Sequence, residues 1–388
     1  MLYILGDQAL QEWPPIRAVD ADDGAIWKVR VEHWLDHPTH VRPTALERQR
    51  PAHYRTSGMA AKNFPVLFIT ASRIGDAVLS SGLIRTLVEE VPGARFTIVA
   101  SALTAPLFAR TPGLDGVIIM EKRPLGLHWL MLWWKVRRRR WGLVVDLRGS
   151  ALASLLHPTR RAVNRMDGPP AHKVVEAARL LKLADNPPAP FLFTDPDTEA
   201  CAERLTAGAT PILAIAPAAN WIGKTWPAER YAMVARKLLG PGGALAGGRL
   251  MVLGGPDDQT AAAPVKAAVS RTRCIDLVGQ EDLLVSFACL KRARLFIGAD
   301  SGLMHLAAAA GAPTLGLFGP SDEERYRPWG PVGRTVRGAR SFAEFKAVDP
   351  KLDQAICHMM ELSTSTVLAA ANSLIAESQG EDRDAAIR

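Results

Sequence analysis

The sequence predicts an α/β fold made of two doubly wound parallel-sheet domains that face a central cleft. Continuous apolar strands alternate with amphipathic helices from Phe64 onward, which is typical of a parallel sheet that helices cover on both faces. A stretch rich in proline and acidic residues, 183–200, interrupts the alternation, and the same pattern then restarts. The chain has 388 residues, which is enough for two domains with large cores.

The first domain is expected over residues 59–205. Its strands are predicted in the apolar runs PVLFIT, RFTIVAS, GVIIM and GLVVDL, which begin at residues 65, 95, 116 and 142. The helices after them are expected over 76–91, 103–110, 128–141 and 150–157. Residues 1–58 contain many prolines, histidines and arginines but no sustained period. We expect them to form an extension that is poorly ordered or that reflects a start codon assigned upstream of Met59.

The second domain is expected over residues 206–362. Its strands are predicted in PILAIAP, RLMVLGG, LFIGA and TLGLFG, which begin at residues 211, 249, 295 and 314, and its helices over 228–239, 282–293 and 302–311. A last helix over about 364–378 and a polar, frayed tail complete residues 363–388. Ligands bind beyond the carboxyl ends of the strands in such sheets, so the cleft between the domains is the expected site.

The composition indicates a soluble globular protein. Apolar residues make up 48% and charged residues 22% of the chain. The apolar runs are too short or too interrupted to span a bilayer, and the acidic start of the chain predicts no signal peptide. The four cysteines lack metal-ligand spacing, so we expect buried thiols in a reduced cytoplasm: Cys201, Cys274, Cys289 and Cys357.

The charge of the chain indicates an acidic partner. The formal net charge is +8 and the pI is near 9.5, which is compatible with a phosphate-bearing substrate, an anionic membrane or a nucleic acid. Tryptophans, other apolar residues and basic residues are concentrated in HWLMLWWKVRRRRW, residues 128–141. This segment is compatible with a helix in a membrane interface and equally with a core-packed helix that has a solvated basic end. No known nucleic-acid-binding motif accompanies the basic run, so we expect no nucleic-acid partner.

The Gly-Lys-Thr at 223–225 resembles the end of a P-loop but fails two requirements. A P-loop has glycine five residues before its Gly-Lys, and Ala218 stands at that position. Proline belongs in the first turn of a helix, so the helix is expected to begin near Pro227 and not directly after the lysine. Lys224 is therefore expected on an exposed loop, where it needs another explanation.

The strongest motif for anion binding is the turn Asp300-Ser301-Gly302 between an apolar strand and a helix of small residues. Free N–H groups and the positive dipole end of such a helix attract anions, and glycine lets a phosphate approach the backbone. Asp300 or Ser301 can also serve only as a helix N-cap. His305 favours a ligand site, because it lies four residues after Ser301 on the same helical face.

A second strand-loop-helix unit, ITASRIGDAVLSSG, places Asp76 in a first helical turn. The helix dipole favours the ionised carboxylate there, so Asp76 can accept a proton at neutral pH. On spacing alone, a helix-capping aspartate is an equally good interpretation. Arg73 can bind an anionic substrate or remain solvated.

The following motifs, which span about residues 64–335, resemble glycosyltransferase family 9, the lipopolysaccharide heptosyltransferases: RIGDAVLSSGLIRTL, VVDLRGS, PAANWIGKTWPAERY, VLGGPDD and the segment 298–331. The resemblance implies a GT-B architecture of two Rossmann-like domains, with the acceptor on the first and the nucleotide-sugar on the second. It also implies inverting transfer without a cofactor or metal ion, from ADP-heptose to a lipid-linked saccharide of the lipopolysaccharide core.

The resemblance assigns roles to individual residues. It implies that Asp76 is the general base and that Lys224 contacts the donor phosphates and stabilises the leaving diphosphate. Asp257 or Asp258 is placed where a carboxylate binds ribose hydroxyls, and Arg73 is expected to bind the acceptor. The implied donor-phosphate turn consists of Asp300, Ser301, Gly302, Leu303, Met304 and His305.

Two departures from the family pattern are the N-terminal extension and the SSG after AVL, where many members have proline. These departures leave the subfamily, the donor sugar and the acceptor open, and they do not change the expected chemistry. Two alternatives to the transferase remain: a non-catalytic nucleotide-sugar-binding protein, and a Rossmann dehydrogenase. A Rossmann dehydrogenase would need Gly-x-Gly-x-x-Gly after the first strand, and this sequence has TASRIGD there instead. The expected setting is the cytoplasm, with peripheral contact to the inner membrane through 128–141.

Overall fold

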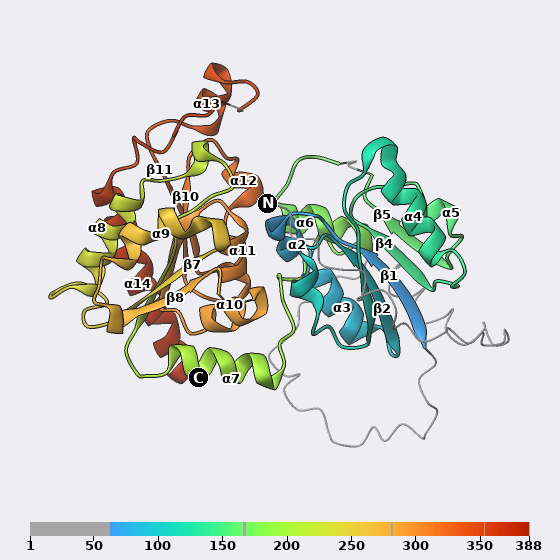
Figure 1. Cartoon of the computed structure of the whole chain (residues 1–388), viewed down its shortest axis with the longest axis horizontal. Helices are drawn as coiled ribbons and strands as arrows, with labels where there is room; N and C mark the ends of the chain where they lie inside the picture. The colour runs from blue at the N-terminus through green and yellow to red at the C-terminus, as the bar shows by residue number, and fades with distance from the viewer. Residues whose placement is uncertain (1–62, 166–167, 281, 353, 388) are drawn as a thin grey trace. The chain divides into compact units, whose positions relative to one another are not determined.

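The computed structural model describes residues 63–165, 168–280, 282–352 and 354–387, and side chains as far as Ser378 (Figure 1). The expectation for residues 1–58 lies outside this range. The described chain contains two parallel β-sheets that are both packed against helices, and the α/β fold with two doubly wound sheets is confirmed.

The first sheet has the strand order β3-β2-β1-β4-β5, and every neighbouring pair is parallel. Its strands are β1 (Phe64–Ile69), β2 (Ala94–Ala100), β3 (Leu114–Ile119), β4 (Leu143–Asp146) and β5 (Arg160–Val163). The associated helices are α2 (Ile74–Leu79), α3 (Gly82–Glu90), α4 (Leu127–Val136), α5 (Leu152–Leu155) and α6 (Lys173–Ala178). The expected helix over 103–110 is only a short 3-10 helix, Ala105–Phe108.

The second sheet has the order β11-β10-β9-β6-β7-β8 and is also parallel throughout. Its strands are β6 (Ile212–Ala216), β7 (Arg249–Gly254), β8 (Cys274–Val278), β9 (Leu295–Ala299), β10 (Thr314–Phe318) and β11 (Gly333–Arg337). Its helices are α7 (Pro196–Thr206), α8 (Ala228–Leu239), α9 (Gln259–Lys266), α10 (Leu283–Leu290), α11 (Gly302–Ala309), α12 (Glu323–Tyr326), α13 (Phe342–Val348) and α14 (Thr364–Ile387).

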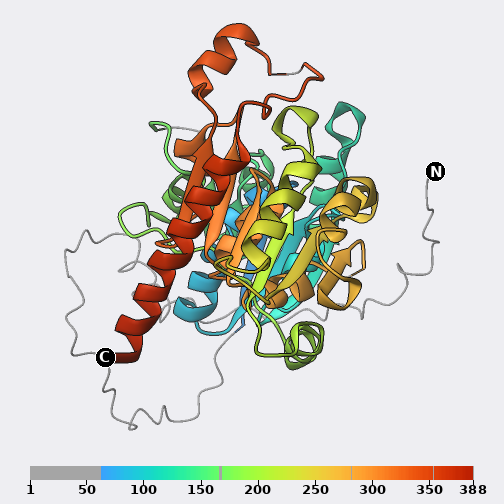
Figure 2. The ribbon, with the colours of Figure 1, turned by 90° about the vertical axis from the view of Figure 1, so that its left-hand side faces the viewer.

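Both sheets are buried on their two faces, which explains the continuous apolar strands. In the second sheet, α8 and α14 cover one face (Figure 2), and their apolar side chains join those of β6, β7 and β9 in one buried cluster. The other face packs against α10 and α11. In the first sheet, α4 and α5 pack on one face. Full burial of both faces removes the alternation of apolar and polar residues that a one-sided sheet would have.

The stretch expected as a linker contains the start of α7. Asp195 caps this helix, because its carboxylate accepts a hydrogen bond from the backbone N of Thr198 at 2.9 Å. The helix lies before residue 206, where the sequence places the second domain, and it packs against α10 of the second sheet. The last helix, α14, begins at Thr364 as expected but continues to Ile387, so the polar tail is helical where frayed chain was predicted.

The single helix expected over 76–91 is divided into α2 and α3 at Ser80 and Ser81. Both hydroxyls donate hydrogen bonds to backbone carbonyls of the preceding turn, at 2.6–3.1 Å, which competes with regular helical bonding. The Ser81 hydroxyl also accepts from the backbone N of Phe191 at 2.9 Å. A Cβ atom at Gly82 would lie 2.5 Å from the carbonyl oxygens of Pro188 and Ala189. The SSG sequence therefore docks the connecting segment against the helix.

The helix expected over 128–141 ends at Val136. The indole N–H of Trp141 donates to the Val136 carbonyl oxygen at 3.1 Å, and Trp141 is buried beside β4. Arg139 forms an ion pair with Asp115 at 2.6 Å, so it is not part of a freely solvated basic run. These contacts thus end the helix before the four arginines at 137–140.

The cysteine prediction is correct only in part. Among the residues that the structure describes, none of the four cysteines forms a disulfide, but only Cys289 is buried, whereas Cys201, Cys274 and Cys357 are half-buried. Within the described ranges, no helix combines the length and the apolar character needed to cross a bilayer.

Candidate active site

The candidate site residues lie at the carboxyl ends of strands that flank the topological switch points of the two sheets. The strand order reverses between β1 and β4 in the first sheet and between β6 and β9 in the second. Asp76 follows β1, Lys224 follows β6 and Asp300 follows β9. Crevices at such switch points are the common ligand sites of open α/β sheets.

Helices α2 and α11 meet at their N-terminal ends. A Cβ atom at Gly302 would lie 2.7 Å from the Cβ of Ile74, and one at Gly75 would lie 2.9 Å from Cδ2 of His305. Real Cβ atoms do not approach so closely, so both glycines are needed for this contact. The contact brings the turn after β1 next to the turn after β9, and it places Asp76 beside the predicted anion turn.

The N-terminus of α11 has the features of an anion site. The N-cap residue Ser301 has an extended backbone and makes no capping hydrogen bond, and its buried Oγ has no hydrogen-bond partner within the described ranges. The first backbone N–H groups of a helix have no intrahelical acceptor, so those of Gly302, Leu303 and Met304 are available to a ligand. Met304 is fully buried in the core, so its side chain packs and only its backbone can bind.

Asp300 is buried between two basic side chains. Its Oδ2 lies 2.6 Å from Nζ of Lys224, and its Oδ1 lies 3.7 Å from Nε2 of His305. Burial alone would raise the pKa of Asp300, but His305 and Lys224 outweigh it and hold that pKa well below the usual range. His305 is itself buried, and its Nδ1 has no hydrogen-bond partner in the part of the chain that is described.

Asp76 lies in the first turn of α2, but it does not cap that helix. The N-cap position is Arg73, and neither residue's side chain makes a capping hydrogen bond. Tyr326 lies close enough for the Asp76 and Asp300 carboxylates to affect it: burial chiefly raises the pKa of Tyr326, and both carboxylates raise it further. The two predicted acidic residues therefore share one neighbourhood. Arg73 is exposed at the same turn.

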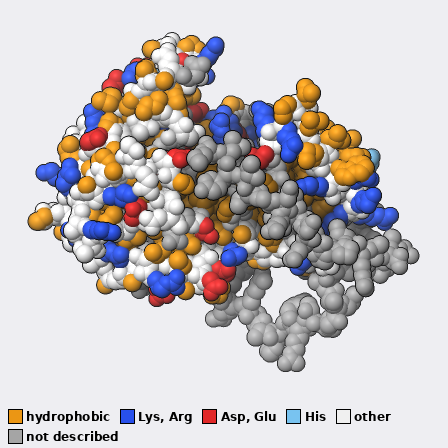
Figure 3. Space-filling model, in the orientation of Figure 1, with side chains coloured by type: hydrophobic (Ala, Val, Ile, Leu, Met, Phe, Trp, Pro, Cys, Tyr) orange, Lys and Arg blue, Asp and Glu red, His pale blue; other side chains and the backbone are white. Residues whose placement is uncertain are grey.

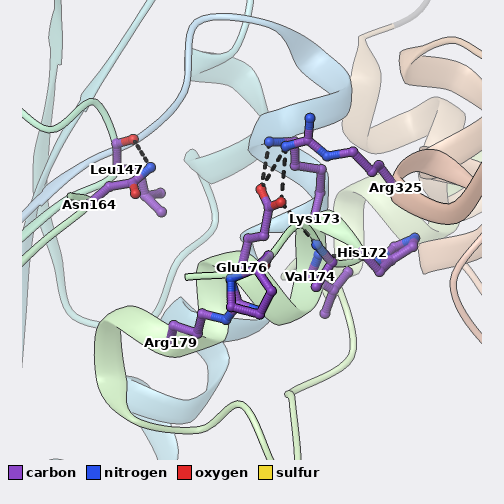
Figure 4. A network of polar contacts seen from close by, with 10 residues as sticks. Leu147, Asn164, His172, Lys173, Val174, Glu176, Arg179 and Arg325 are labelled. Carbon is purple, nitrogen blue, oxygen red and sulfur yellow. Dashed lines mark hydrogen bonds and ion pairs between the residues drawn. The ribbon is translucent and has the colours of Figure 1, made fainter. Parts of the chain in front are cut away.

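A polar network beside this neighbourhood connects α6 with the segment around α12 (Figure 4). Glu176 accepts hydrogen bonds from Arg325 at 2.9 and 3.1 Å and from Lys173 at 2.6 Å. Burial would raise the pKa of Glu176, but Lys173 and Arg325 hold it below its usual value. Nε2 of His172 contacts the Arg327 carbonyl oxygen at 2.9 Å. The network fixes the chain on both sides of Tyr326, a residue that the sequence did not single out.

Asp257 and Asp258 follow β7 and differ in their surroundings. Oδ2 of Asp258 accepts a hydrogen bond from the backbone N of Gly255 at 2.7 Å, so this carboxylate holds the turn. Asp257 is exposed. Of the two, Asp257 is the better placed to accept hydroxyl groups of a ligand.

A pocket of about 640 Å³ opens at the carboxyl ends of the first sheet. Loops after β1, β2, β3 and β4 contribute to it, together with the first turns of α4. Its lining residues are Ser72, Ser101, Ala102, Leu103, Met120, Glu121, Lys122, His128, Trp129 and Arg148. None of them was among the predicted site residues, although His128 and Trp129 belong to the segment 128–141 that was predicted to contact a membrane or the core. Arg148 could have been predicted as a site residue, because it directly follows the apolar strand in VVDLRGS.

Helix α4 is apolar on two faces. Leu132 and Val136 are buried, and Trp129 and Trp133 pack against the same cluster. The opposite face, which we call the α4 stripe, consists of Leu127, Leu130, Met131 and Trp134, with 48%, 60%, 44% and 63% of their surface exposed. Figure 3 displays hydrophobic side chains together with Lys and Arg over this helix. Helix α4 thus has a core-packed face, as the core-packing interpretation of 128–141 predicted, and an exposed apolar face.

The described residues contain no group of three or more His, Cys, Asp or Glu side chains that is arranged to hold a metal ion.

The chain is similar to known glycosyltransferases in sequence and in fold. The model of glycosyltransferase family 9 (heptosyltransferase) matches residues 129–353. Lipopolysaccharide heptosyltransferase 2 of Salmonella typhimurium is 25% identical over 314 residues, which cover 70% of this chain and 87% of that protein. Lipooligosaccharide heptosyltransferase 2 of Haemophilus ducreyi is 28% identical over 305 residues, 66% of this chain and 83% of that protein. The solved ADP-heptose lipopolysaccharide heptosyltransferase II of E. coli has a TM-score of 0.64 at 22% identity, covering 81% of this chain and all of that one.

Proposed function

Because the chain belongs to glycosyltransferase family 9 and is a heptosyltransferase-like glycosyltransferase, we propose that it transfers heptose from ADP-heptose to a lipid-linked saccharide of the lipopolysaccharide core. The transfer inverts the anomeric carbon and needs no metal ion. One observation carries the proposal: the Ser301 hydroxyl at the start of α11 is buried and has no hydrogen-bond partner among the described residues, and its turn meets the Asp76 turn.

The donor diphosphate binds at the N-terminus of α11. The backbone N–H groups of residues 302–304 and the Ser301 hydroxyl donate to its oxygens, and the helix dipole favours its charge. Lys224 is held at 2.6 Å from Asp300, which orients the ammonium while it still has donors for phosphate. As the glycosidic bond breaks, negative charge grows on the leaving diphosphate, and Lys224 stabilises it. Asp257 accepts the ribose hydroxyls, with Asp258 holding the turn.

Asp76 activates the acceptor hydroxyl as the general base. The acceptor oxygen attacks the anomeric carbon while the bond from that carbon to the phosphate oxygen breaks, and the electron pair leaves with ADP. The hydroxyl proton passes to the Asp76 carboxylate. This carboxylate makes no capping bond that would compete for its oxygens. Arg73, exposed on the same turn, is placed to attract an anionic acceptor.

The first test is a nucleotide panel that compares ADP, UDP and GDP by thermal shift, followed by turnover of ADP-heptose with a core-saccharide acceptor. ADP should stabilise the protein most, by about 2.7 kcal/mol at a concentration of a hundred times its Kd. Transfer should persist in excess EDTA. Stabilisation by ADP without transfer to any core acceptor would instead support a non-catalytic nucleotide-sugar-binding protein. If none of the three nucleotides stabilises the protein, the proposed donor site is wrong.

The proposed setting is the cytoplasmic surface of the inner membrane, which α4 contacts through its stripe. Four apolar side chains on one helical face are exposed, and Leu125 just before the helix is 98% exposed. Arg138 and Arg140 lie exposed after the helix. Apolar insertion combined with basic residues is the pattern of interfacial helices on anionic lipid.

Sedimentation with vesicles tests this contact. The protein should sediment with anionic phosphatidylglycerol vesicles and dissociate as salt rises, because screening shortens the electrostatic attraction. Leu130→Ser combined with Trp134→Ser should reduce the bound fraction several-fold, since about 25 cal/mol per Å² of apolar burial is lost. Met233→Ser on α8, which removes a 43% exposed apolar side chain elsewhere, is the control. Equal binding of both variants would show that the stripe is not the contact.

A further inference from the structure

The pocket at the carboxyl ends of the first sheet is not used by the proposed mechanism. It is lined by the aromatic rings of His128 and Trp129, by several hydroxyl and charged groups, and by the Arg148 guanidinium. Arg148 follows β4, which pairs directly with β1. The loop after β1 carries Ser72 of the pocket wall and leads into the first turn of α2, which contains the proposed base Asp76. A group bound in the pocket therefore lies near the Asp76 turn, the proposed site of proton transfer.

Arg148 is the lining residue whose hydrogen bonding is incomplete. Its Nε donates to the Thr70 carbonyl oxygen at 2.9 Å, which fixes the guanidinium plane. Its Nη2 is buried and has no hydrogen-bond partner within the described residues. A buried donor on a charged group without an acceptor is costly to the fold, so an arrangement that supplies an acceptor is favoured.

The nearest carboxylates do not supply that acceptor. Asp146 is fully buried, and its oxygens accept from the backbone N of Arg148 and of Ser150, both at 2.9 Å. Glu121 accepts from the backbone N of Ala102 at 2.7 Å. Burial lowers the pKa of Arg148, although the charges of Asp146 and Glu121 oppose this. Both acids organise the loops around the pocket and leave Nη2 unpaired.

The other lining groups suit a saccharide that carries negative charge. Lys122 is exposed at the pocket and adds a second positive charge. Trp129 offers an apolar surface, and the hydroxyl of the exposed Ser72 can exchange hydrogen bonds with sugar hydroxyls. Leu103, which is 59% exposed, lines the pocket, and Trp129 belongs to the helix that carries the α4 stripe. The pocket thus lies next to the surface proposed to face the lipid.

We propose that this pocket binds an anionic group of the acceptor saccharide, a carboxylate or a phosphate, and that Arg148 is the residue that recognises it. The planar guanidinium presents paired donors that match either oxyanion. This inference rests on the proposed function, because it identifies the bound saccharide as the acceptor. It adds a specificity-determining residue on the acceptor side, where the sequence predicted only Arg73.

The experiment measures binding of three small probes to the full chain by calorimetry and ligand-observed NMR. Glucose 6-phosphate carries the phosphate, glucuronate carries the carboxylate, and glucose is the neutral reference. At least one charged probe should bind more tightly than glucose, and the better of the two identifies the preferred oxyanion. Arg148→Gln should weaken that probe about ten-fold or more, since one charge-assisted hydrogen bond is lost. ADP affinity and melting temperature should stay unchanged.

Arg161→Gln is the matched control, because it removes an equal charge from an exposed arginine on β5 of the same sheet, outside the pocket lining. Arg148→Lys keeps the charge without the planar fork and should bind the probe with intermediate affinity, which provides a second variant if the glutamine protein does not fold. The proposal is overturned if glucose binds as well as both charged probes, or if Arg148→Gln and Arg161→Gln behave alike. Failure of ADP to bind would remove the proposed donor site but leave the anion result standing, so the two hypotheses fail separately.

Discussion

Asp76→Asn is expected to lower turnover by about 10²-fold or more while ADP affinity and melting temperature stay nearly unchanged. The acceptor hydroxyl must lose its proton as it attacks the anomeric carbon, and an amide cannot take it. Asn is close to Asp in shape, and the Asp76 side chain makes no capping hydrogen bond that the substitution could remove. Steady-state kinetics with the best donor, together with ADP calorimetry, measure both parts of the prediction.

A carboxylate in another first helical turn provides the control for Asp76. Asp197 lies in the first turn of α7 and is exposed. Asp197→Asn removes the same charge from a helix N-terminus, so it reproduces any general effect of the helix dipole. It should leave turnover unchanged. If the folded Asp76→Asn protein transfers sugar at the wild-type rate, Asp76 is not the base, although the donor site would be unaffected.

Lys224→Ala is expected to weaken donor use by about 1.5–3 kcal/mol, or about 10- to 150-fold in kcat/KM for the donor. The lost interaction is a charge-assisted contact with the diphosphate that strengthens as the leaving group gains charge. The melting temperature should also fall, because Asp300 is only 6% exposed and loses the ammonium at 2.6 Å. Kinetics and ADP binding must therefore be measured well below the melting temperature of the variant.

Lys237→Ala separates the specific effect of Lys224 from the loss of one positive charge. Lys237 is exposed in the last turn of α8 in the same sheet domain, and its replacement should change neither donor kinetics nor ADP affinity. Unchanged donor kinetics in folded Lys224→Ala would place this lysine outside the donor site. Its ion pair with Asp300 would then be structural only.

The predicted central strands agree with the structure because most or all of their length is buried between helices. β1, β6 and β9 each appear in the sequence as a continuous apolar run, and such a run has few alternative structures in a chain of this length. The edge strands β5, β8 and β11 were not predicted. They contain polar residues such as Arg160 and Asp276, because one side of an edge strand faces no neighbouring strand.

Helix ends were also decided outside the local sequence. The Ser81 hydroxyl holds a segment more than a hundred residues away along the chain, and Trp141 takes the carbonyl at which α4 ends. Neither partner can be identified from the residues within one helical turn. Propensity predicts that a helix forms, and tertiary hydrogen bonds determine where it ends.

The sequence by itself determined the type of each candidate group and its place at a strand end: Asp76 after β1, Lys224 after β6, and the turn 300–305 after β9. Only the tertiary structure decided which of these groups meet. Lys224 pairs with Asp300 across 76 positions of the chain, and the α2 and α11 turns touch through two glycines. Nη2 of Arg148 is buried without an acceptor in the part of the chain that the structure describes. The physical reason is that local sequence controls backbone conformation over a few residues, whereas burial and distance between remote groups depend on how the sheets and helices pack.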